Sequence, residues 1–225
     1  LFMNDITVEQ KIFLSSKYDN ADVEEIFDEM TEFLLLYHSA VKEVKTKLEI
    51  LDEEFKIKRK RNPIEYMKSR IKTPKSIMSK LERKGFEMSI SSAKINLHDI
   101  AGIRVVCSFV DDIYEVANTL IKQDDIILIE EKDYIKNPKP NGYRSLHLVV
   151  QVPVFFSEHV ELVKVEVQIR TIAMDFWASL EHKLYYKTEK NSSLDIKQDL
   201  KECADIISST DLRMQQIQRQ VEFLD

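Results

Sequence analysis

Two neighbouring stretches of the chain, SLHLVVQVPV at residues 145–154 and VELVKVEVQIR at residues 160–170, alternate between apolar and polar side chains. Because successive side chains of a β-strand point to opposite faces of a sheet, this alternation predicts two strands. One face of the second strand is apolar, and the other carries Lys164, Glu166, Gln168 and Arg170. Such a polar face is typical both of a solvated antiparallel sheet and of a sheet that binds a ligand.

Helical spacing dominates both ends of the chain, and the remaining strands fall in its middle. Apolar residues three and four apart predict a long helix over residues 20–59, within an N-terminal helical extension that covers residues 1–61. Further helices are expected near residues 63–71, 73–84, 111–123, 171–188 and 194–224, and further strands at 102–109 and 126–135. The predicted fold class is therefore α+β, a mixed β-sheet flanked by helices, with long N- and C-terminal helices.

Composition limits the classes of protein to which the chain can belong. No apolar run approaches the roughly 20 residues of a membrane span, so we expect no membrane association. The two cysteines, Cys107 and Cys203, share no metal-ligand spacing, which suits a reducing compartment and predicts a cytoplasmic protein. The net charge of −6 argues against a nucleic acid as the substrate.

One segment is strongly basic despite this acidic balance. Residues 56–84 contain twelve Lys or Arg and two Glu, a local balance of +10. Arg70 and Lys72 precede a helix expected to begin at Thr73, and Ser76 and Lys80 lie one turn apart within it. Cations at a helix N-terminus form an anion site, although a solvated helix face has a similar composition. The only glycines are at 85, 102 and 142, which excludes a P-loop and a dinucleotide-binding fingerprint.

Two carboxylates are candidates for a magnesium site. Asp99 lies in HDIAGIRVV, residues 98–106, beside a turn at Gly102 and a strand from which Arg104 projects. Mg²⁺ is commonly held by one or two carboxylates together with substrate phosphates. Asp99 and Glu166, on an adjacent strand, would supply these carboxylates. The alternative role for Asp99 is that of a turn or helix cap. The five histidines of the chain form no set for the metal dyad of HD-type phosphohydrolases.

The loop before the first of the two opening strands, NPKPNGYRSLHL at residues 137–148, combines two prolines with an Asn-Gly turn. This rigid turn would expose Tyr143 as a stacking platform for a base. Lys139 and His147 would then reach phosphates. The alternative is a simple hairpin turn with a tyrosine in the core.

Four stretches together resemble the synthetase domain of the RelA/SpoT-homologue family, over residues 62–188: DIAGIRVV, DYIKNPKPNGYRSLHL, VEVQIRT and MDFWASLEHKLYYK. The resemblance implies a small alarmone synthetase of the RelP type, with a nucleotidyltransferase-like fold and a catalytic domain at residues 62–190. It implies transfer of the β,γ-pyrophosphate of ATP to the 3′-hydroxyl of GDP or GTP, with Mg²⁺ as cofactor. It also implies a homotetramer, in which the helix of residues 191–225 contacts a neighbouring subunit.

The same resemblance implies residue roles. The ATP-binding residues would be Arg70, Lys72, Ser76, Lys80 and Arg104, with the two arginines on either side of the adenine. The acceptor nucleotide would be held by Tyr143, which stacks on guanine, and by Lys139, Asn141, His147 and Gln168. Asp99 and Glu166 would bind the metal, and Glu166 would also align and deprotonate the hydroxyl. Phe176 and Trp177 are expected in the core or an interface, behind the sheet, with Glu181 and His182 as lesser ligand candidates.

Two other classes remain open on the residues alone. A nucleotidyltransferase would use a related sheet but usually pairs its carboxylates at alternate positions of one strand, and the chain contains no Asp-x-Asp. A non-catalytic nucleotide- or RNA-binding module would suit the basic segment and Tyr143. Asp99 and Glu166 disfavour that module, because they would repel a polyanion that lacks a metal.

Overall fold

The computed structural model describes the backbone of residues 20–188 and 194–224, with side chains for residues 28–184 and 196–224. The helices are α2 (Asn20–Lys58), α3 (Pro74–Lys84), α4 (Ile90–Asn96), α5 (Val110–Ile121), α6 (Ile172–Thr188) and α7 (Leu194–Glu222). The strands are β1 (Ile64–Ile71), β2 (Ala101–Cys107), β3 (Ile127–Asp133), β4 (Leu146–Phe155) and β5 (Val160–Thr171). The parts of the predicted terminal segments at residues 1–19, 191–193 and 225 lie outside the described residues.

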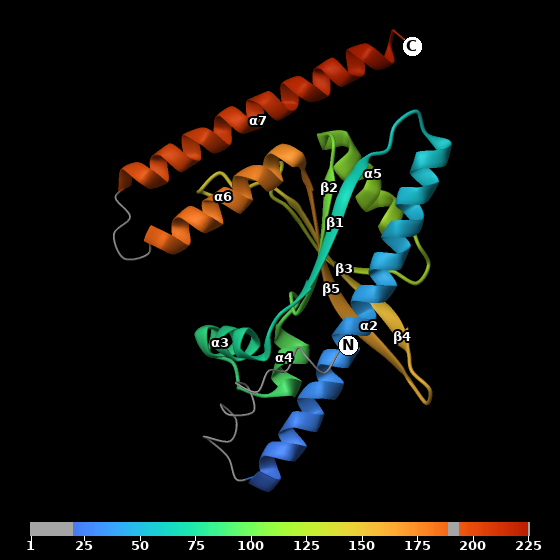
Figure 1. Cartoon of the computed structure of the whole chain (residues 1–225), viewed down its shortest axis with the longest axis vertical. Helices are drawn as coiled ribbons and strands as arrows, with labels where there is room; N and C mark the ends of the chain where they lie inside the picture. Colours follow the sequence, from blue (N-terminus) through green and yellow to red (C-terminus); the bar gives the residue numbers. More distant parts are fainter. Residues whose placement is uncertain (1–19, 189–193, 225) are drawn as a thin grey trace.

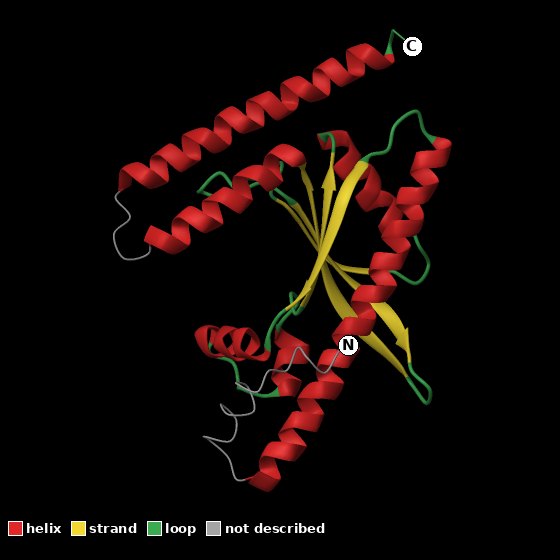
Figure 2. Cartoon of the chain, in the orientation of Figure 1, coloured by secondary structure: helices red, strands yellow, loops and turns green. Residues whose placement is uncertain are grey.

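The five strands form one mixed sheet, as predicted, in the order β1-β2-β5-β4-β3. Figure 2 shows this sheet with the helices around it. Strands β2 and β5 are parallel, and every other neighbouring pair is antiparallel. The central strand β5 therefore lies between β2 and β4, the strands that follow the Asp99 segment and the 137–145 loop. This order brings both segments to the same strand.

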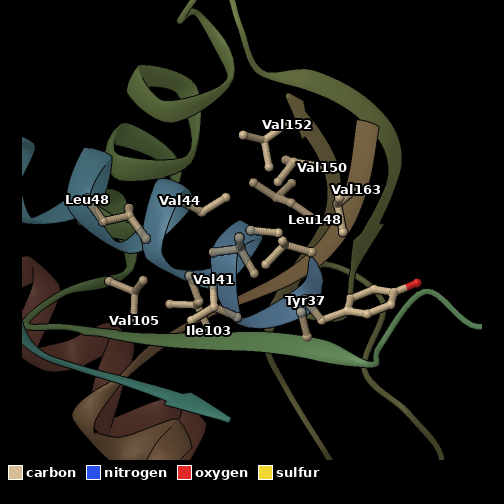
Figure 3. Close-up of a cluster of buried hydrophobic side chains, with 14 of the residues drawn as sticks. Tyr37, Val41, Val44, Leu48, Ile103, Val105, Leu148, Val150, Val152 and Val163 are labelled. Atoms are coloured by element: carbon tan, nitrogen blue, oxygen red, sulfur yellow. The ribbon is translucent and has the colours of Figure 1, made fainter. Parts of the chain in front are cut away.

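The core lies between one face of the sheet and helix α2, which runs along that face (Figure 1). Figure 3 shows the apolar stripe of α2 against side chains of β2, β4 and β5. The stripe contributes Tyr37, Val41, Val44 and Leu48, and the sheet contributes Ile103, Val105, Leu148, Val150, Val152 and Val163. Full burial of each aliphatic side chain stabilises the fold by about 1.5–3 kcal/mol. The alternation of β4 and β5 places these side chains on one face of the sheet, so α2 covers that face.

The segment at residues 63–71 is a strand, so the prediction of a short helix there was wrong. Ile64, Met67 and Ile71 are spaced by three and then four residues, which resembles helical spacing. In the structure they belong to β1, where the pairing register shifts between Ile64 and Tyr66. A bulge adds one residue to a strand, so it converts a spacing of two into a spacing of three on the same face.

Helix α7 crosses the end of the sheet beside α6 and is fastened to the rest of the fold by polar contacts (Figure 1). The Thr171 hydroxyl donates to Asp211 at 2.6 Å, and Nε1 of Trp177 donates to the carbonyl of Leu200 at 2.9 Å. Trp177 is buried, as predicted, whereas Phe176 is 58% exposed. Among the described residues, none of the helices combines the length and hydrophobicity needed to cross a bilayer.

Candidate active site

The face of the sheet opposite α2 carries two neighbouring rows of side chains that run across all five strands. Pairing between the strands places Lys68, Arg104, Gln168, His147 and Lys132 in one row. The adjacent row contains Arg70, Gly102, Glu166, Val149 and Glu130. Five of the residues proposed from the sequence therefore stand in two adjacent rows, although they come from four strands.

A cleft of about 280 Å³ opens over the second row. Its walls come from α3, from the segment before β2 and from strands β3, β4 and β5. The lining residues are Lys80, Lys84, Asn96, His98, Asp99, Glu130, Lys132, His147, Val149 and Glu166. Both proposed metal carboxylates thus face one cavity, together with several cations.

Asp99 is held by two lysines and keeps one oxygen free. Its Oδ2 atom lies 2.5 Å from Nζ of Lys80 and 3.4 Å from Nζ of Lys72. Burial would raise the pKa of Asp99, but these two lysines outweigh burial, and the pKa is lowered. The buried Oδ1 atom has no hydrogen-bond partner within the described part of the chain. A buried oxygen without a partner is costly, so this atom marks a position where a ligand or metal would bind.

Helix α3 starts where the sequence predicted, and Lys80 and Lys84 in its second half line this cleft. Thr73 caps the helix, because its hydroxyl oxygen accepts from the amide of Ser76 at 3.3 Å, and Pro74 occupies the first turn. Gly85 ends the helix in the left-handed conformation, with φ of 71°. Lys80 lies on the side of α3 that meets Asp99, whereas Ser76 is exposed and binds the cap residue.

The two proposed adenine-binding arginines differ in their surroundings. Arg70 on β1 extends over Gly102, where a Cβ atom would lie 3.6 Å from its Cγ. Arg104 on β2 forms an ion pair with Asp175, with 3.1 Å between Nη1 and Oδ1. Arg70 is therefore an exposed side chain at the edge of the sheet, and Arg104 is held from the side of α6.

Glu166 belongs to a closed ring of five hydrogen-bonded side chains. It accepts from Nδ1 of His147 at 3.1 Å and from Nε2 of Gln168 at 2.8 Å. Nε2 of His147 lies 2.8 Å from the Tyr143 hydroxyl, which accepts from Nη2 of Arg170 at 2.5 Å. Arg170 closes the ring, because Nη2 also donates to Oε1 of Gln168 at 2.9 Å.

The ring has one consistent direction of donation. A guanidinium only donates, so Tyr143 accepts from Arg170 and can donate to His147, which donates in turn to Glu166. Burial raises the pKa of Tyr143, which keeps its hydroxyl protonated for this role. Burial also acts to raise the pKa of Glu166, but the hydrogen bonds from His147 and Gln168 outweigh it and lower that pKa. Glu166 is therefore a carboxylate at neutral pH.

The expectation of an exposed Tyr143 is wrong. Tyr143 is partly buried, because its hydroxyl binds Arg170 and His147 and its ring lies edge-on to Tyr134. The Lys139 ammonium lies 4.8 Å from the centre of the Tyr143 ring and 4.7 Å from that of Tyr134. Asn141 forms the turn by accepting from the Tyr143 amide at 3.2 Å, and its amide donates to Glu181 of α6 at 3.2 Å.

Arg170 and Asp175 are two residues of the site whose roles were not predicted from the sequence. Arg170 continues the polar alternation of β5, and this position was the one feature of the sequence that could have indicated a role in the site. Asp175 binds Tyr66, Arg104 and Arg170, all from the polar face. The start of α6 therefore lies on the polar side of the sheet rather than behind it, which corrects the expectation for this segment.

Comparison with known protein families decides the class of this site. The family model described as "Region found in RelA / SpoT proteins" matches residues 69–191. The chain belongs to the RelA/SpoT family. This RelA/SpoT-family protein is 46% identical over 201 residues to the GTP pyrophosphokinase YwaC of Bacillus subtilis (strain 168), covering 89% of this chain and 96% of that one. It is thus an enzyme of the GTP pyrophosphokinase class.

Solved structures agree with this assignment for the RelA/SpoT-family protein. The crystal structure of small alarmone synthetase 2 from Bacillus subtilis superposes with a TM-score of 0.75 at 48% identity, covering 83% of this chain and 97% of that one. Small alarmone synthetase 1 from Bacillus subtilis, solved with its product pppGpp, gives a TM-score of 0.79 at 37% identity, covering 86% and 98%. The fold expected from the sequence is therefore confirmed, and the nucleotidyltransferase and binding-module alternatives are not adopted.

Proposed function

We propose that this protein transfers the β,γ-pyrophosphate of ATP to the 3′-hydroxyl of GDP or GTP within the cleft around Asp99 and Glu166. The 3′-oxygen attacks the β-phosphorus, the bond between that phosphorus and the oxygen of the α-phosphate breaks, and AMP leaves. The products are ppGpp or pppGpp and AMP. The observation that carries the proposal is the convergence of Asp99, Lys80 and Glu166 on one cavity, where Lys72 also pairs with Asp99 and Asp99 keeps an unpartnered oxygen.

The ATP side of the cleft would be formed by β1, α3 and β2. Lys72 and Lys80 would hold the ATP phosphates and Ser76 would bind them at the start of α3, where the free amides and the helix dipole favour an anion. Arg70 and Arg104, on adjacent strands, would lie on either side of the adenine. These cations would also stabilise negative charge on the transferred group.

The acceptor side would be formed by the 137–145 loop and the first row of the sheet. Tyr143 would stack on guanine, and Lys139, Asn141, His147 and Gln168 would hold the remaining groups of the nucleotide. Lys139 now lies beside the Tyr143 ring, so acceptor binding would have to displace its ammonium. A base would then replace the cation on the ring, and Lys139 would become available to phosphate.

The chain offers Mg²⁺ two carboxylates, Asp99 and Glu166, in the same cleft. Among the described residues no set of three or more His, Cys, Asp or Glu side chains is placed to hold a metal. Two carboxylates with phosphate oxygens nevertheless suit Mg²⁺, which rarely uses an all-protein cage, and the unpartnered Oδ1 of Asp99 fits a ligand position. Bound Mg²⁺ would neutralise charge on the ATP phosphates.

Glu166 would align the 3′-hydroxyl and accept its proton as the oxygen attacks. The lowered pKa keeps this carboxylate ionised at neutral pH, and its ring of hydrogen bonds fixes the side chain. Gln168 and His147 would thereby serve two purposes, because they contact the acceptor and also orient the base.

Product analysis tests the proposal. The protein is incubated with γ-labelled ATP, GDP and Mg²⁺, and the nucleotides are separated by chromatography. We expect the γ label in the guanosine product and one AMP for each product formed. Release of the γ label as pyrophosphate, with AMP joined to the acceptor, would instead identify nucleotidyl transfer and overturn the proposal.

The assembly we infer is a homotetramer acting in the cytoplasm, with residues 62–190 as the catalytic domain and the C-terminal helix as a subunit contact. In support, α6 and α7 expose apolar side chains, among them Phe176, Leu180, Ile206, Met214 and Val221. Exposed apolar surface of this kind is typical of interaction sites. Light scattering should give about four times the chain mass of 26.5 kDa, and a monomer mass would contradict the assembly.

A further inference from the structure

Asp175 is a buried carboxylate that joins three strands of the polar face. It lies in the first turn of α6 and is 6% exposed. Its Oδ2 atom accepts from the Tyr66 hydroxyl of β1 at 2.8 Å. Its Oδ1 atom forms an ion pair with Nη1 of Arg104 on β2 at 3.1 Å and accepts a hydrogen bond from Nη1 of Arg170 on β5 at 3.2 Å. One side chain thus determines where two arginines of the site lie.

The charge balance makes both arginines dependent on this carboxylate. Arg170 is 4% exposed, and a guanidinium so buried needs a partner. Among the described residues, Asp175 is the one carboxylate within ion-pair distance of Arg104 or Arg170. Nε of Arg104 is buried and has no partner in that part of the chain, so its orientation rests on the contact to Asp175. Loss of the Asp175 charge would release both side chains.

Asp175 connects two parts of the site, through an ion pair to Arg104 and a hydrogen-bonded ion pair to Arg170. Arg104 stands on the proposed ATP side of the cleft. Arg170 is a member of the ring that holds Glu166, through Gln168 on one side and through Tyr143 and His147 on the other. A displacement of Arg170 would therefore reach both oxygens of the Glu166 carboxylate.

We propose that Asp175 is a positioning residue for pyrophosphate transfer, which links the ATP-side Arg104 to the hydrogen-bonded ring around Glu166. This inference rests on the proposed function. Asp175 would touch neither nucleotide and would act through the two arginines. Because a misplacement of about 1 Å can cost roughly 10²-fold in rate, loss of its charge would reduce catalysis in protein that is still folded.

The primary variant is Asp175→Asn, which keeps the shape of the side chain and removes its charge. We expect kcat per folded molecule to fall by about 10²-fold, with a higher KM for ATP, because both arginines lose their ion pair. Tyr66→Phe is the matched control: it removes one hydrogen bond from the same carboxylate and leaves both arginine contacts, so its kcat should stay close to that of the wild type. A kcat within twofold of the wild type in folded Asp175→Asn would overturn the proposal.

A double variant separates positioning from a structural role. In the wild type, Gln168→Met breaks the ring between Arg170 and Glu166. In the Asp175→Asn background the ring is already disturbed, so the same change should reduce kcat by a smaller factor. If Gln168→Met reduces kcat by the same factor in both backgrounds, Asp175 does not act through the ring around Glu166.

If Asp175→Asn does not fold, Asp175→Glu gives the test, because it keeps the charge and moves it by one methylene group. We then expect a lower kcat with little change in the melting temperature, and a wild-type kcat would overturn the proposal.

Wild-type protein is assayed in parallel. A wild type without pyrophosphate transfer would refute the proposed function, whereas an active wild type with an equally active Asp175 variant would refute the positioning role alone.

Discussion

Nε2 of Gln168 donates a 2.8 Å hydrogen bond to Oε2 of Glu166, two residues back on the same face of β5. The amide is fixed at its other end, because Arg170 donates to Oε1 of Gln168 at 2.9 Å and a guanidinium cannot accept. With His147 on Oε1, both oxygens of Glu166 are held by donors. Donors to a carboxylate favour its charged form, which explains why the pKa of Glu166 is lowered despite burial.

Gln168→Met should move the acid limb of the pH–activity profile to higher pH. The substitution removes one of the donors that lower the pKa of Glu166, while burial still acts to raise it. Activity requires the carboxylate form of Glu166 and is lost as the pH falls through its pKa. With a higher pKa, activity is therefore lost at a higher pH. The measurement is kcat/KM against pH for both proteins, and an unmoved acid limb would show that Glu166 ionisation does not control activity.

Tyr143→Ala should weaken the binding of GDP more than that of ATP. Stacking of a base on an aromatic ring contributes about 1–3 kcal/mol, so the dissociation constant for GDP should rise by roughly 5- to 150-fold. Tyr143→Phe keeps the ring and loses the hydroxyl contacts to Arg170 and His147, so it should retain GDP affinity and lose turnover. Calorimetry with each nucleotide separates these effects, and an unchanged GDP affinity in Tyr143→Ala would argue against stacking.

Gly142→Ala should destabilise the fold more than Gly85→Ala. Both glycines have positive φ, 87° and 71°, so an alanine costs about 1–2 kcal/mol at either position. A Cβ at Gly142 would also lie 2.5 Å from Cβ of Ala204 on α7, whereas nothing lies within 4 Å of one at Gly85. The crowding adds about 1–3 kcal/mol.

Urea unfolding of both glycine variants measures this difference in the free energy of unfolding. Ala204→Gly in the Gly142→Ala background should recover the part due to crowding, because it removes the atom that the new Cβ meets. If both single variants lose the same free energy of unfolding, α7 does not contact the 137–145 loop closely enough to exclude a Cβ atom at residue 142.

Local alternation was enough to predict the centre of the sheet. Strands β4 and β5 carry one apolar and one polar side chain in turn, so Glu166, Gln168 and His147 could be assigned to one face before the structure was known. Strand β1 could not be found in this way, because its bulge gives the apolar residues a helical spacing. In a short segment, the spacing of apolar residues alone does not distinguish a bulged strand from a helix.

The contacts that were missed are those between distant parts of the chain. Tyr143 loses its exposure because Arg170, 27 residues further on, binds its hydroxyl. Asp175 and Tyr66 are 109 residues apart. From the sequence alone, a side chain on a rigid turn is expected to be exposed. The partners that cover Tyr143 follow from the order of the strands, which places β5 beside β4.

The kcat of Glu166→Gln, measured together with nucleotide binding, decides whether Glu166 is the base of pyrophosphate transfer. Glutamine keeps the size of the side chain but cannot accept the hydroxyl proton, so pyrophosphate transfer should fall by about 10²–10⁴-fold while ATP and GDP still bind. Glu161→Gln, on the same strand and outside the cleft, is the control and should leave turnover unchanged. Near-wild-type turnover in folded Glu166→Gln would contradict the role of Glu166 as the base.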